Sequence, residues 1–313
     1  MKPSFVRSIE RWLSRGRREV LRRVGRAGQV GSSEPPGAPR RVGQRPAALR
    51  LVTGSPACDA DSLAASLAYA RLLQLQAGRA WVLPYAPIPR AELRLRPEVL
   101  ELFRAAGLDP RGLLFADELR PEQLLALGEV RLSVLDSDGS HLPEAAQARI
   151  DEVLDHHPSS GFCKPADPHG PAVVRTVEPV GSVCTLVAER FSRRKPEALD
   201  PALARLLLGA ILLDTAGLDP AAGRVVERDR EAAGRLTALA GLDPAGLYGR
   251  LQAARRELTA LSTEELLRRD YKEGRAGAWR YGISSVPLGR ERWLERDPRL
   301  DEGVQRFREA HGL

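Results

Sequence analysis

Cysteine, lysine and long apolar runs are all scarce in this sequence of 313 residues. Its three cysteines, Cys58, Cys163 and Cys184, lie far apart and are odd in number. They exclude a disulfide framework and a zinc knuckle, and they favour a reducing compartment. No run approaches the roughly 18 apolar residues of a transmembrane helix. The first 20 residues carry eight charges and no apolar run, so we expect no signal peptide and a cytoplasmic protein.

Positive charge is concentrated at one end of the chain. Residues 1–50 hold 13 Lys and Arg against three Glu, a net charge of +10. That leaves 35 of the 48 basic and 38 of the 41 acidic side chains in the other 263 residues, a net charge of −3. The basic segment could contact acidic surfaces. Because the rest of the chain is slightly acidic, we expect no stable nucleic-acid partner.

The basic segment divides into a helical part and a Pro/Gly-rich part. Residues 5–24 place Phe5, Ile9 and Trp12 near one face and arginines on the other, which predicts a basic amphipathic helix. We favour a helix docked on its own domain; contact with a membrane surface and a mitochondrial leader are the alternatives. Residues 27–47 are rich in Gly, Pro and Ser and predict a disordered linker.

Short apolar runs alternate with helical patterns from residue 48 onward. This alternation predicts βα units and an α/β fold with a parallel sheet. A mainly helical stretch follows from Pro179 to Gly217, and a second unit begins near residue 236. The expected strands are Ala48–Thr53, Trp81–Pro84, Leu113–Phe115, Leu132–Leu135, Val153–Leu154 and, in the second unit, Tyr281–Val286.

Acidic residues follow four of the apolar runs. Asp59 and Asp61 come after the first expected strand, Asp136 follows Leu135, residues 155–157 read D-H-H, and Asp214 ends an aliphatic run. Since the carboxyl ends of parallel strands share one edge of the sheet, these side chains would converge there. Their charges would repel unless a cation offset them. Carboxylates with imidazole suit Mn²⁺ or Mg²⁺, and a pair of such ions is the usual clamp for phosphoryl transfer.

Each motif also has a purely structural interpretation. Asp59 and Asp61 could cap the following helix, Asp136 and Asp138 could form a turn, and the two histidines could lie in a surface loop. Asp214 is harder to explain in this way, because a buried carboxylate needs a partner. Four motifs in order, each at the end of an element, favour a metal cluster.

The order of these motifs resembles the DHH phosphoesterase superfamily. Residues 178–185 (E-P-V-G-S-V-C-T) are similar to a signature of the family II inorganic pyrophosphatases. Residues 54–62 (G-S-P-A-C-D-A-D-S) and 261–272 (L-S-T-E-E-L-L-R-R-D-Y-K) are similar to segments of the Prune-type exopolyphosphatases. The resemblance implies a parallel-sheet DHH domain over residues 48–234, after the N-terminal helix and linker of residues 1–47. It implies a smaller α+β DHH-associated domain over residues 235–313 that lacks its last strands.

The resemblance also implies a chemistry. It implies two divalent cations, with Mn²⁺ favoured and Mg²⁺ or Co²⁺ as substitutes, and hydrolysis of phosphoanhydride bonds in pyrophosphate or short-chain polyphosphate. It allows cyclic nucleotide phosphodiesters as well. In this scheme Asp136 and Asp214 bridge the two ions. The implied site residues are Asp59, Asp61, Asp136, His156 and Asp214 for the metals, and His157, Arg269 and Lys272 for the phosphate.

Three positions depart from the family pattern. Ser55 stands where the family has His or Asn, and Ser137 and Asp138 stand where it has His followed by His or Asn. A neutral hydroxyl is a poor ligand for a divalent ion, and Asp138 would either add an oxygen ligand or repel a polyanion. His141 could substitute for the missing imidazole or be a loop residue. The alternative function is therefore a catalytically impaired binding or regulatory protein that keeps the metal-site scaffold.

Overall fold

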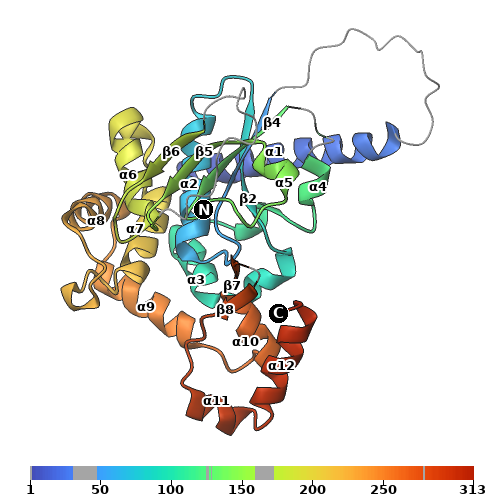
Figure 1. The fold of residues 1–313 in the computed structure, drawn as a ribbon. Helices are drawn as coiled ribbons and strands as arrows, with labels where there is room; N and C mark the ends of the chain where they lie inside the picture. The colour runs from blue at the N-terminus through green and yellow to red at the C-terminus, as the bar shows by residue number, and fades with distance from the viewer. Residues whose placement is uncertain (1, 31–47, 125–126, 128, 159–172, 278) are drawn as a thin grey trace.

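The computed structural model describes residues 2–30, 48–124, 127, 129–158, 173–277 and 279–313. They form a parallel six-stranded sheet with its helices, followed by a part that carries a two-stranded antiparallel ribbon (Figure 1). The α/β fold with a parallel sheet is confirmed, as is the smaller second unit. The strands are β1 (Leu49–Thr53), β2 (Trp81–Ala86), β3 (Leu114–Phe115), β4 (Val130–Leu135), β5 (Ile150–Asp155), β6 (Val174–Val177), β7 (Tyr271–Ala276) and β8 (Trp279–Ser284).

The strand order is β3-β2-β1-β4-β5-β6, which places β1 at the centre of the sheet. Leu51 of β1 pairs with Leu83 of β2 on one side and with Leu132 of β4 on the other. These strands are buried on both faces, which is why they read in the sequence as continuous apolar runs rather than alternating ones. The sheet order reverses direction between β1 and β4, where α/β sheets bind their ligands.

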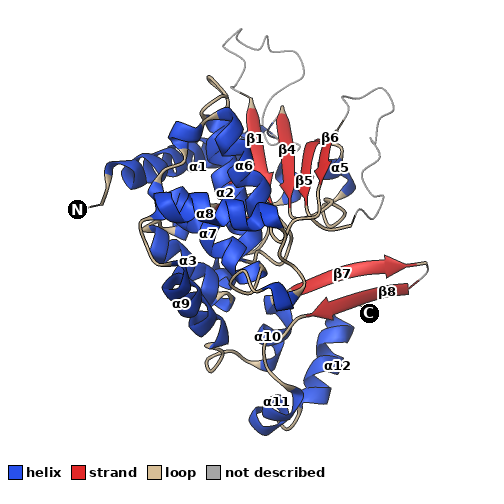
Figure 2. Ribbon diagram, turned by 90° about the vertical axis from the view of Figure 1, so that its left-hand side faces the viewer, coloured by secondary structure: helices blue, strands red, loops and turns tan. Residues whose placement is uncertain are grey.

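Helices cover the sheet and fill the space between the two parts. Figure 2 shows α2, α6 and α7 stacked on one side of the sheet. The α-helices are α1 (Ser4–Val30), α2 (Ala60–Gln74), α3 (Pro97–Ala106), α4 (Pro121–Leu124), α5 (Glu144–Gln147), α6 (Val183–Arg194), α7 (Pro201–Asp214), α8 (Glu227–Ala240), α9 (Pro244–Arg256), α10 (Thr263–Arg269), α11 (Arg290–Arg296) and α12 (Leu300–Ala310). The 3-10 helices are η1 (Arg90–Leu95), η2 (Pro110–Gly112), η4 (Pro196–Ala198) and η5 (Pro220–Ala222).

The N-terminal helix α1 is docked on the sheet domain, as expected. Ile9 and Trp12 are buried in the main hydrophobic core, and the Trp12 indole N–H lies 3.2 Å from the carbonyl oxygen of Val82 in β2. The apolar face of α1 is therefore used inside the protein. The linker was expected to begin at residue 27, but residues 27–30 continue the helix; residues 31–47 lie outside the described part of the chain.

Two strands were missed, and a third is displaced. β6 has the sequence V-R-T-V and lies at the edge of the sheet, where it needs no continuous apolar run. β7 reads Y-K-E-G-R-A and continues the charged pattern of α10, so its sequence gives no strand signal. β8 begins at Trp279, earlier than the expected Tyr281. The chain already turns at Gly277, whose φ of 61° lies in the left-handed region, so the strand starts two residues before the expected Tyr281–Val286.

The hydrophobic packing divides the chain into two cores. The main core includes Leu247 and Leu251 of α9, and a second, smaller core joins Leu95 of η1 to apolar residues from Leu258 onward. The packing thus changes later in the chain than the expected boundary at residues 234–235, which itself stays a prediction. In Figure 2 the β7–β8 ribbon lies beside the ends of the sheet strands from which the first site loops emerge.

Among the residues that the structure describes, no helix combines the length and apolar character that crossing a membrane requires.

Candidate metal centre

Three loops at the carboxyl ends of neighbouring strands carry the acidic motifs. After β1, Asp59 caps the N-terminus of α2 and Asp61 lies in its first turn; the loop after β4 begins at Asp136, and the loop after β5 carries His156. Cys58 and Asp136 have φ values of 49° and 55°, in the left-handed region that non-glycine residues rarely adopt. Such strain is typical of functional sites. The structure therefore brings these motifs together at the sheet edge, as the sequence predicted.

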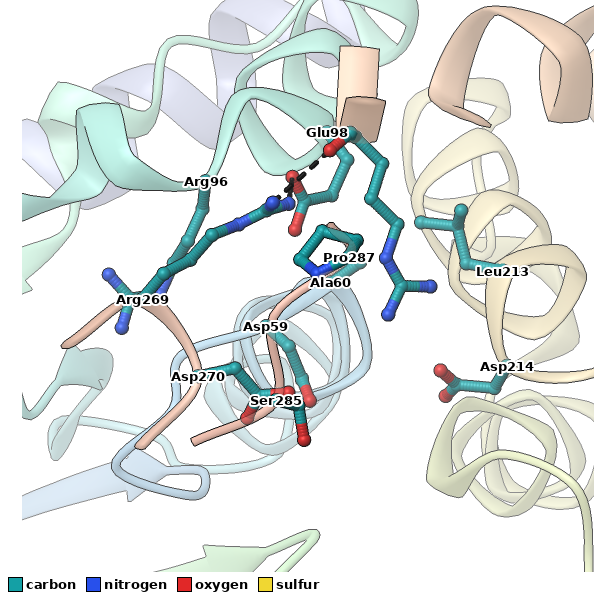
Figure 3. A pocket seen from close by; sticks show the side chains of 11 residues that line it. Asp59, Ala60, Arg96, Glu98, Leu213, Asp214, Arg269, Asp270, Ser285 and Pro287 are labelled. Carbon is teal, nitrogen blue, oxygen red and sulfur yellow. Dashed lines mark hydrogen bonds and ion pairs between the residues drawn. The ribbon is translucent and has the colours of Figure 1, made fainter. Parts of the chain in front are cut away.

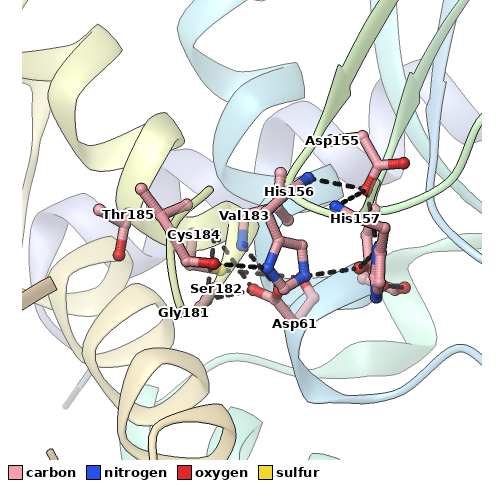
Figure 4. Close-up of polar contacts among 12 residues, drawn as sticks. Asp61, Asp155, His156, His157, Gly181, Ser182, Val183, Cys184 and Thr185 are labelled. Atoms are coloured by element: carbon pink, nitrogen blue, oxygen red, sulfur yellow. Dashed lines mark hydrogen bonds and ion pairs between the residues drawn. The ribbon is translucent and has the colours of Figure 1, made fainter. Parts of the chain in front are cut away.

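The buried Asp61 is held by the N-terminus of α6. Its Oδ1 accepts the Ser182 hydroxyl at 2.6 Å, and its Oδ2 accepts the backbone N–H of Val183 at 2.8 Å (Figure 4). The Asp61 carboxylate thus accepts from a backbone N–H that an isolated helix N-terminus leaves unpaired. The dipole of α6 also favours its negative charge. Asp61 Oδ2 lies 3.6 Å from His156 Nε2. One carboxylate oxygen therefore remains directed at the imidazole.

His156 is oriented for a metal by a carbonyl group. Its Nδ1 lies 2.9 Å from the carbonyl oxygen of Val180 and donates to it, so Nε2 is the nitrogen that would bind a metal in place of a proton. Nε2 lies 3.3 Å from Asp136 Oδ1. Burial opposes protonation of His156, but its hydrogen bond with Asp136 and the charge of Asp61 outweigh burial and raise the pKa to about 9. A cation, here a proton, is therefore strongly favoured at this point.

Asp155 holds the second histidine in place. Its Oδ1 accepts from His157 Nδ1 at 2.9 Å and from the backbone N–H of His156 at 2.8 Å (Figure 4). The His157 side chain is 49% exposed, so its other nitrogen is open to a ligand. Asp155 is the first residue of the D-H-H motif, and no role was predicted for it from the sequence. Its position directly before the histidines was the signal that could have found it.

The carboxylates carry more negative charge than the protein alone offsets. Burial, reinforced by the charge of Asp136, raises the pKa of Asp59 to about 7. Burial and the neighbouring Asp61 and Asp59 raise the pKa of Asp214 well above its ordinary value. Atoms of Asp136, His156 and His157 that could bind a metal lie within 4.8 Å of one another. This set of oxygen and nitrogen donors fits a divalent cation.

A buried aspartate accounts for the glycine and the threonine of the E-P-V-G-S-V-C-T segment. Asp229 of α8 accepts the backbone N–H of Gly181 at 2.9 Å and the hydroxyl of Thr185 at 2.7 Å. A Cβ at Gly181 would lie 2.7 Å from the carbonyl oxygen of Arg224, so only glycine fits there. Asp229 thus anchors the loop that holds Asp61 and His156. Asp229 was not predicted from the sequence, because nothing near it in the chain marks it as buried.

The departures from the family pattern lie in hydrogen-bonded turns. The buried Ser55 hydroxyl accepts the backbone N–H of Ala57 at 3.2 Å. The Ser137 hydroxyl accepts the N–H of Gly139 at 3.2 Å and lies 3.2 Å from His141 Nδ1. His141 is therefore coupled to the position where an imidazole is missing. Burial lowers its pKa to about 4, so it is neutral at ordinary pH.

The C-terminal part supplies positive charge opposite the carboxylates. Burial opposes the charged form of Lys272 in β7, but the carboxylates of Asp59 and Asp136 outweigh it and raise the pKa of Lys272. Arg269 is 4% exposed and lines a pocket together with Asp59 and Asp214 (Figure 3). Its guanidinium is paired with the buried Glu98 of α3. Arg269 and Lys272 thus come from the second part of the chain, and Arg269 already has an acidic partner.

Models of two protein families match the chain. The model of the DHH family, N-terminal domain, matches residues 50–211, and the model of the DHHA2 domain matches residues 249–313. Together with the fold and the acidic site, these matches define the class of protein: the chain belongs to the DHH family.

The chain is also similar to individual proteins with described activities. The chain is 33% identical over 262 residues to the exopolyphosphatase PRUNE1 of Rattus norvegicus, covering 81% of this chain and 56% of the rat protein. The human exopolyphosphatase PRUNE1 is 32% identical, with 84% and 57% covered. The chain thus spans little more than half the length of these relatives. A Deinococcus radiodurans protein described as a manganese-dependent inorganic pyrophosphatase is 29% identical, with 68% and 62% covered.

A solved structure shares the fold. The crystal structure of a Methanococcus jannaschii protein classed with the family II inorganic pyrophosphatases superposes with a TM-score of 0.65 at 20% identity. The superposition covers 84% of this chain and 80% of that one.

Proposed function

We propose that this chain hydrolyses phosphoanhydride bonds in pyrophosphate or short-chain polyphosphate with two divalent cations, preferably Mn²⁺. One observation carries the proposal: donor atoms of Asp136, His156 and His157 gather at the carboxyl ends of the strands, and Lys272 of the C-terminal part is close enough to Asp59 and Asp136 to interact with their charges. A polyanionic substrate needs cations on both sides, and this arrangement provides a place for metals on one side and an ammonium group on the other. The names of the relatives support the same class of reaction.

The family resemblance suggests how the predicted ligands would divide between the two ions. Asp59, Asp136 and Asp214 would hold one ion, and Asp61, Asp136, His156 and Asp214 the other. When bound, such ions polarise phosphoryl oxygens and lower the pKa of a coordinated water. Mg²⁺ and Co²⁺ are the substitutes that we expect to support lower activity.

The chain's own residues bind and orient the substrate. His157, fixed through Nδ1 by Asp155, would present Nε2 to a phosphoryl oxygen. Lys272 would offset the charge of the departing phosphate, since its raised pKa keeps it protonated at neutral pH. Contact between Arg269 and the phosphate stays a prediction, because Glu98 holds the guanidinium in this structure.

Phosphate release from pyrophosphate and from tripolyphosphate, measured with Mn²⁺ and with a chelator, tests the proposal. We expect release that depends on Mn²⁺ and is abolished by Asp136→Asn. Cyclic AMP, whose hydrolysis yields 5′-AMP and no free phosphate, is assayed separately by chromatography, because the sequence resemblance allows phosphodiesters. Absence of phosphate release from both pyrophosphate and tripolyphosphate at saturating Mn²⁺ would overturn the proposal.

A second candidate rests on the altered motif after β4. Ser137 and Asp138 take turn hydrogen bonds instead of presenting imidazoles, which favours a binding or regulatory protein that retains the metals without turnover. Tight Mn²⁺ binding without phosphate release would support it. A cytoplasmic location, the lack of a nucleic-acid partner and contact of the basic α1 with acidic surfaces stay predictions.

A further inference from the structure

The pocket between the two parts contains three arginines that differ in their partners. Its walls come from the loop after β1, the ends of α7 and α9, the start of α3 and the segments around β7 and β8 (Figure 3). Asp59 and Asp214 of the candidate metal centre belong to this lining, as do Arg96, Arg255 and Arg269. A phosphate that reaches the carboxylates through this pocket would meet these arginines.

Two of the three arginines are occupied by the protein itself. Arg96 is buried and donates to the backbone carbonyl oxygens of Ala57 and Glu92. Arg269 is buried, pairs with Glu98, and donates to the carbonyl oxygen of Arg255 at 3.1 Å. Releasing either guanidinium would leave buried polar groups unpaired, which is costly. Both arginines therefore shape the wall of the pocket.

The third arginine is different. Arg255, in the last turn of α9, is half-buried, and its guanidinium has no hydrogen bond or ion pair with any residue in the described parts of the chain. Its backbone is nevertheless fixed, because its carbonyl oxygen accepts from Arg269. A partly buried guanidinium with five N–H donors and no acceptor is poorly satisfied by the protein. Arg255 lines the pocket together with Asp59 and Asp214, which would bind metals. Its guanidinium therefore offers N–H donors to an anion bound at the site.

We propose that Arg255 binds a phosphoryl group of the substrate in this pocket, opposite the metal-binding carboxylates. The inference rests on the proposed function, which it deepens by naming the arginine that contacts phosphate. Guanidinium groups bind phosphate through two parallel N–H···O bonds, which gives orientation as well as charge. Arg255 and Lys272 would then hold the anion from two different elements, while Arg269 positions Arg255 through its carbonyl group.

Binding of imidodiphosphate, a diphosphate that resists hydrolysis, separates this inference from catalysis. The probe is titrated by calorimetry into the full chain at saturating Mn²⁺. We expect Arg255→Gln to bind it about 10- to 100-fold more weakly, as the loss of charge-assisted hydrogen bonds implies. Arg255→Lys should recover part of the affinity. Arg256→Gln is the matched control, because Arg256 is exposed, lies next in the chain and is absent from the pocket lining.

Two further measurements exclude a merely structural role. Mn²⁺ affinity and the thermal unfolding midpoint of Arg255→Gln should match those of the unaltered chain, since Arg255 pairs with no described carboxylate. Equal imidodiphosphate affinity in Arg255→Gln and Arg256→Gln, or no binding by the unaltered chain, would overturn the inference. If Arg255→Gln weakens binding and yet no chain releases phosphate, the proposed hydrolysis fails while the phosphate role of Arg255 stands.

Discussion

The candidate site has two sides that are built in different ways. We call Asp59, Asp61, Asp136, His156 and Asp214 the acidic wall, and Arg255, Arg269 and Lys272 the cationic wall. The acidic wall stands on the sheet, and hydrogen bonds from α6 and from the loop before it fix Asp61 and His156. The cationic wall comes from α9, α10 and β7, and Arg269 is held there by Glu98, a residue of the other part of the molecule. The acidic wall is therefore rigid within one domain, whereas the cationic wall depends on how the two parts are joined.

This difference separates metal binding from substrate binding. Asp136 and Asp214 are proposed to share both ions, so changes there should remove the metals themselves. Changes in the cationic wall should leave metal affinity intact and affect phosphate binding. Changes at the junction between the parts should appear first as lost stability.

The largest effect is expected in the acidic wall. Asp136→Asn removes the proposed bridging charge while keeping the side-chain shape. Mn²⁺ affinity should fall by more than about 100-fold, which exceeds the typical cost of losing a residue that only hydrogen-bonds a metal ligand. Asp214→Asn should behave in the same way. Calorimetry with Mn²⁺ measures both. Asp151→Asn, at the start of β5 and paired with Arg50, is the control and should keep full affinity. Unchanged affinity in both Asp136→Asn and Asp214→Asn would contradict the site assignment.

A second effect concerns the joint between the parts. Glu98→Gln leaves the buried Arg269 without its counter-charge, and the free energy of unfolding should fall by about 3–5 kcal/mol. Urea unfolding of the full chain measures it. The double change Glu98→Leu with Arg269→Leu removes both charges and should cost less than Glu98→Gln. If Glu98→Gln proves neutral, the pair does not join the two parts as described.

A third effect concerns phosphate alone. Lys272→Gln should lower kcat/KM for pyrophosphate by about 10- to 100-fold, because a charged donor to the phosphate is lost, and Mn²⁺ affinity should not fall. Lys195→Gln is the control, since Lys195 lies at the end of α6 beside Glu197. Loss of Mn²⁺ binding in Lys272→Gln would show that this lysine supports metal binding and would contradict a role in phosphate binding alone.

The smallest effect is expected from the altered motif. Ser137→His combined with Asp138→His restores the pattern of the family, and phosphate release should rise by up to about 10-fold, the lower end of what outer ligand partners contribute. The assay compares both chains at saturating Mn²⁺. A slower double variant would show that Ser137 and Asp138, with His141 beside them, are adaptations of this chain.

The acidic wall could be predicted from the sequence, because each of its motifs is local. A carboxylate that follows a buried strand must lie at the sheet edge once the strands are parallel, and this places Asp59, Asp61 and Asp136 without further knowledge. Asp229 could not be found in this way. It lies 44 residues from Thr185 along the chain, and only the packing of α8 brings them together.

The cationic wall was only partly predictable for a related reason. The segment 261–272 indicated Arg269 and Lys272, but the partner of Arg269 is 171 residues away, so its pairing with Glu98 has no local signal. Arg255 has none either, since an arginine at the end of a helix is ordinary in a chain with 48 basic residues. Likewise, β6 and β7 are strands because of their neighbours rather than their own composition.

Metals and phosphate are proposed to meet between the acidic and the cationic wall. A crystal structure of the full chain grown with Mn²⁺ and imidodiphosphate tests this proposal most directly, because the anomalous signal of manganese locates each ion. We expect two manganese ions held by Asp59, Asp61, Asp136, His156 and Asp214, with the diphosphate between these ions and the side chains of Lys272 and Arg255. Manganese bound elsewhere, or a diphosphate that touches neither cation, would contradict it.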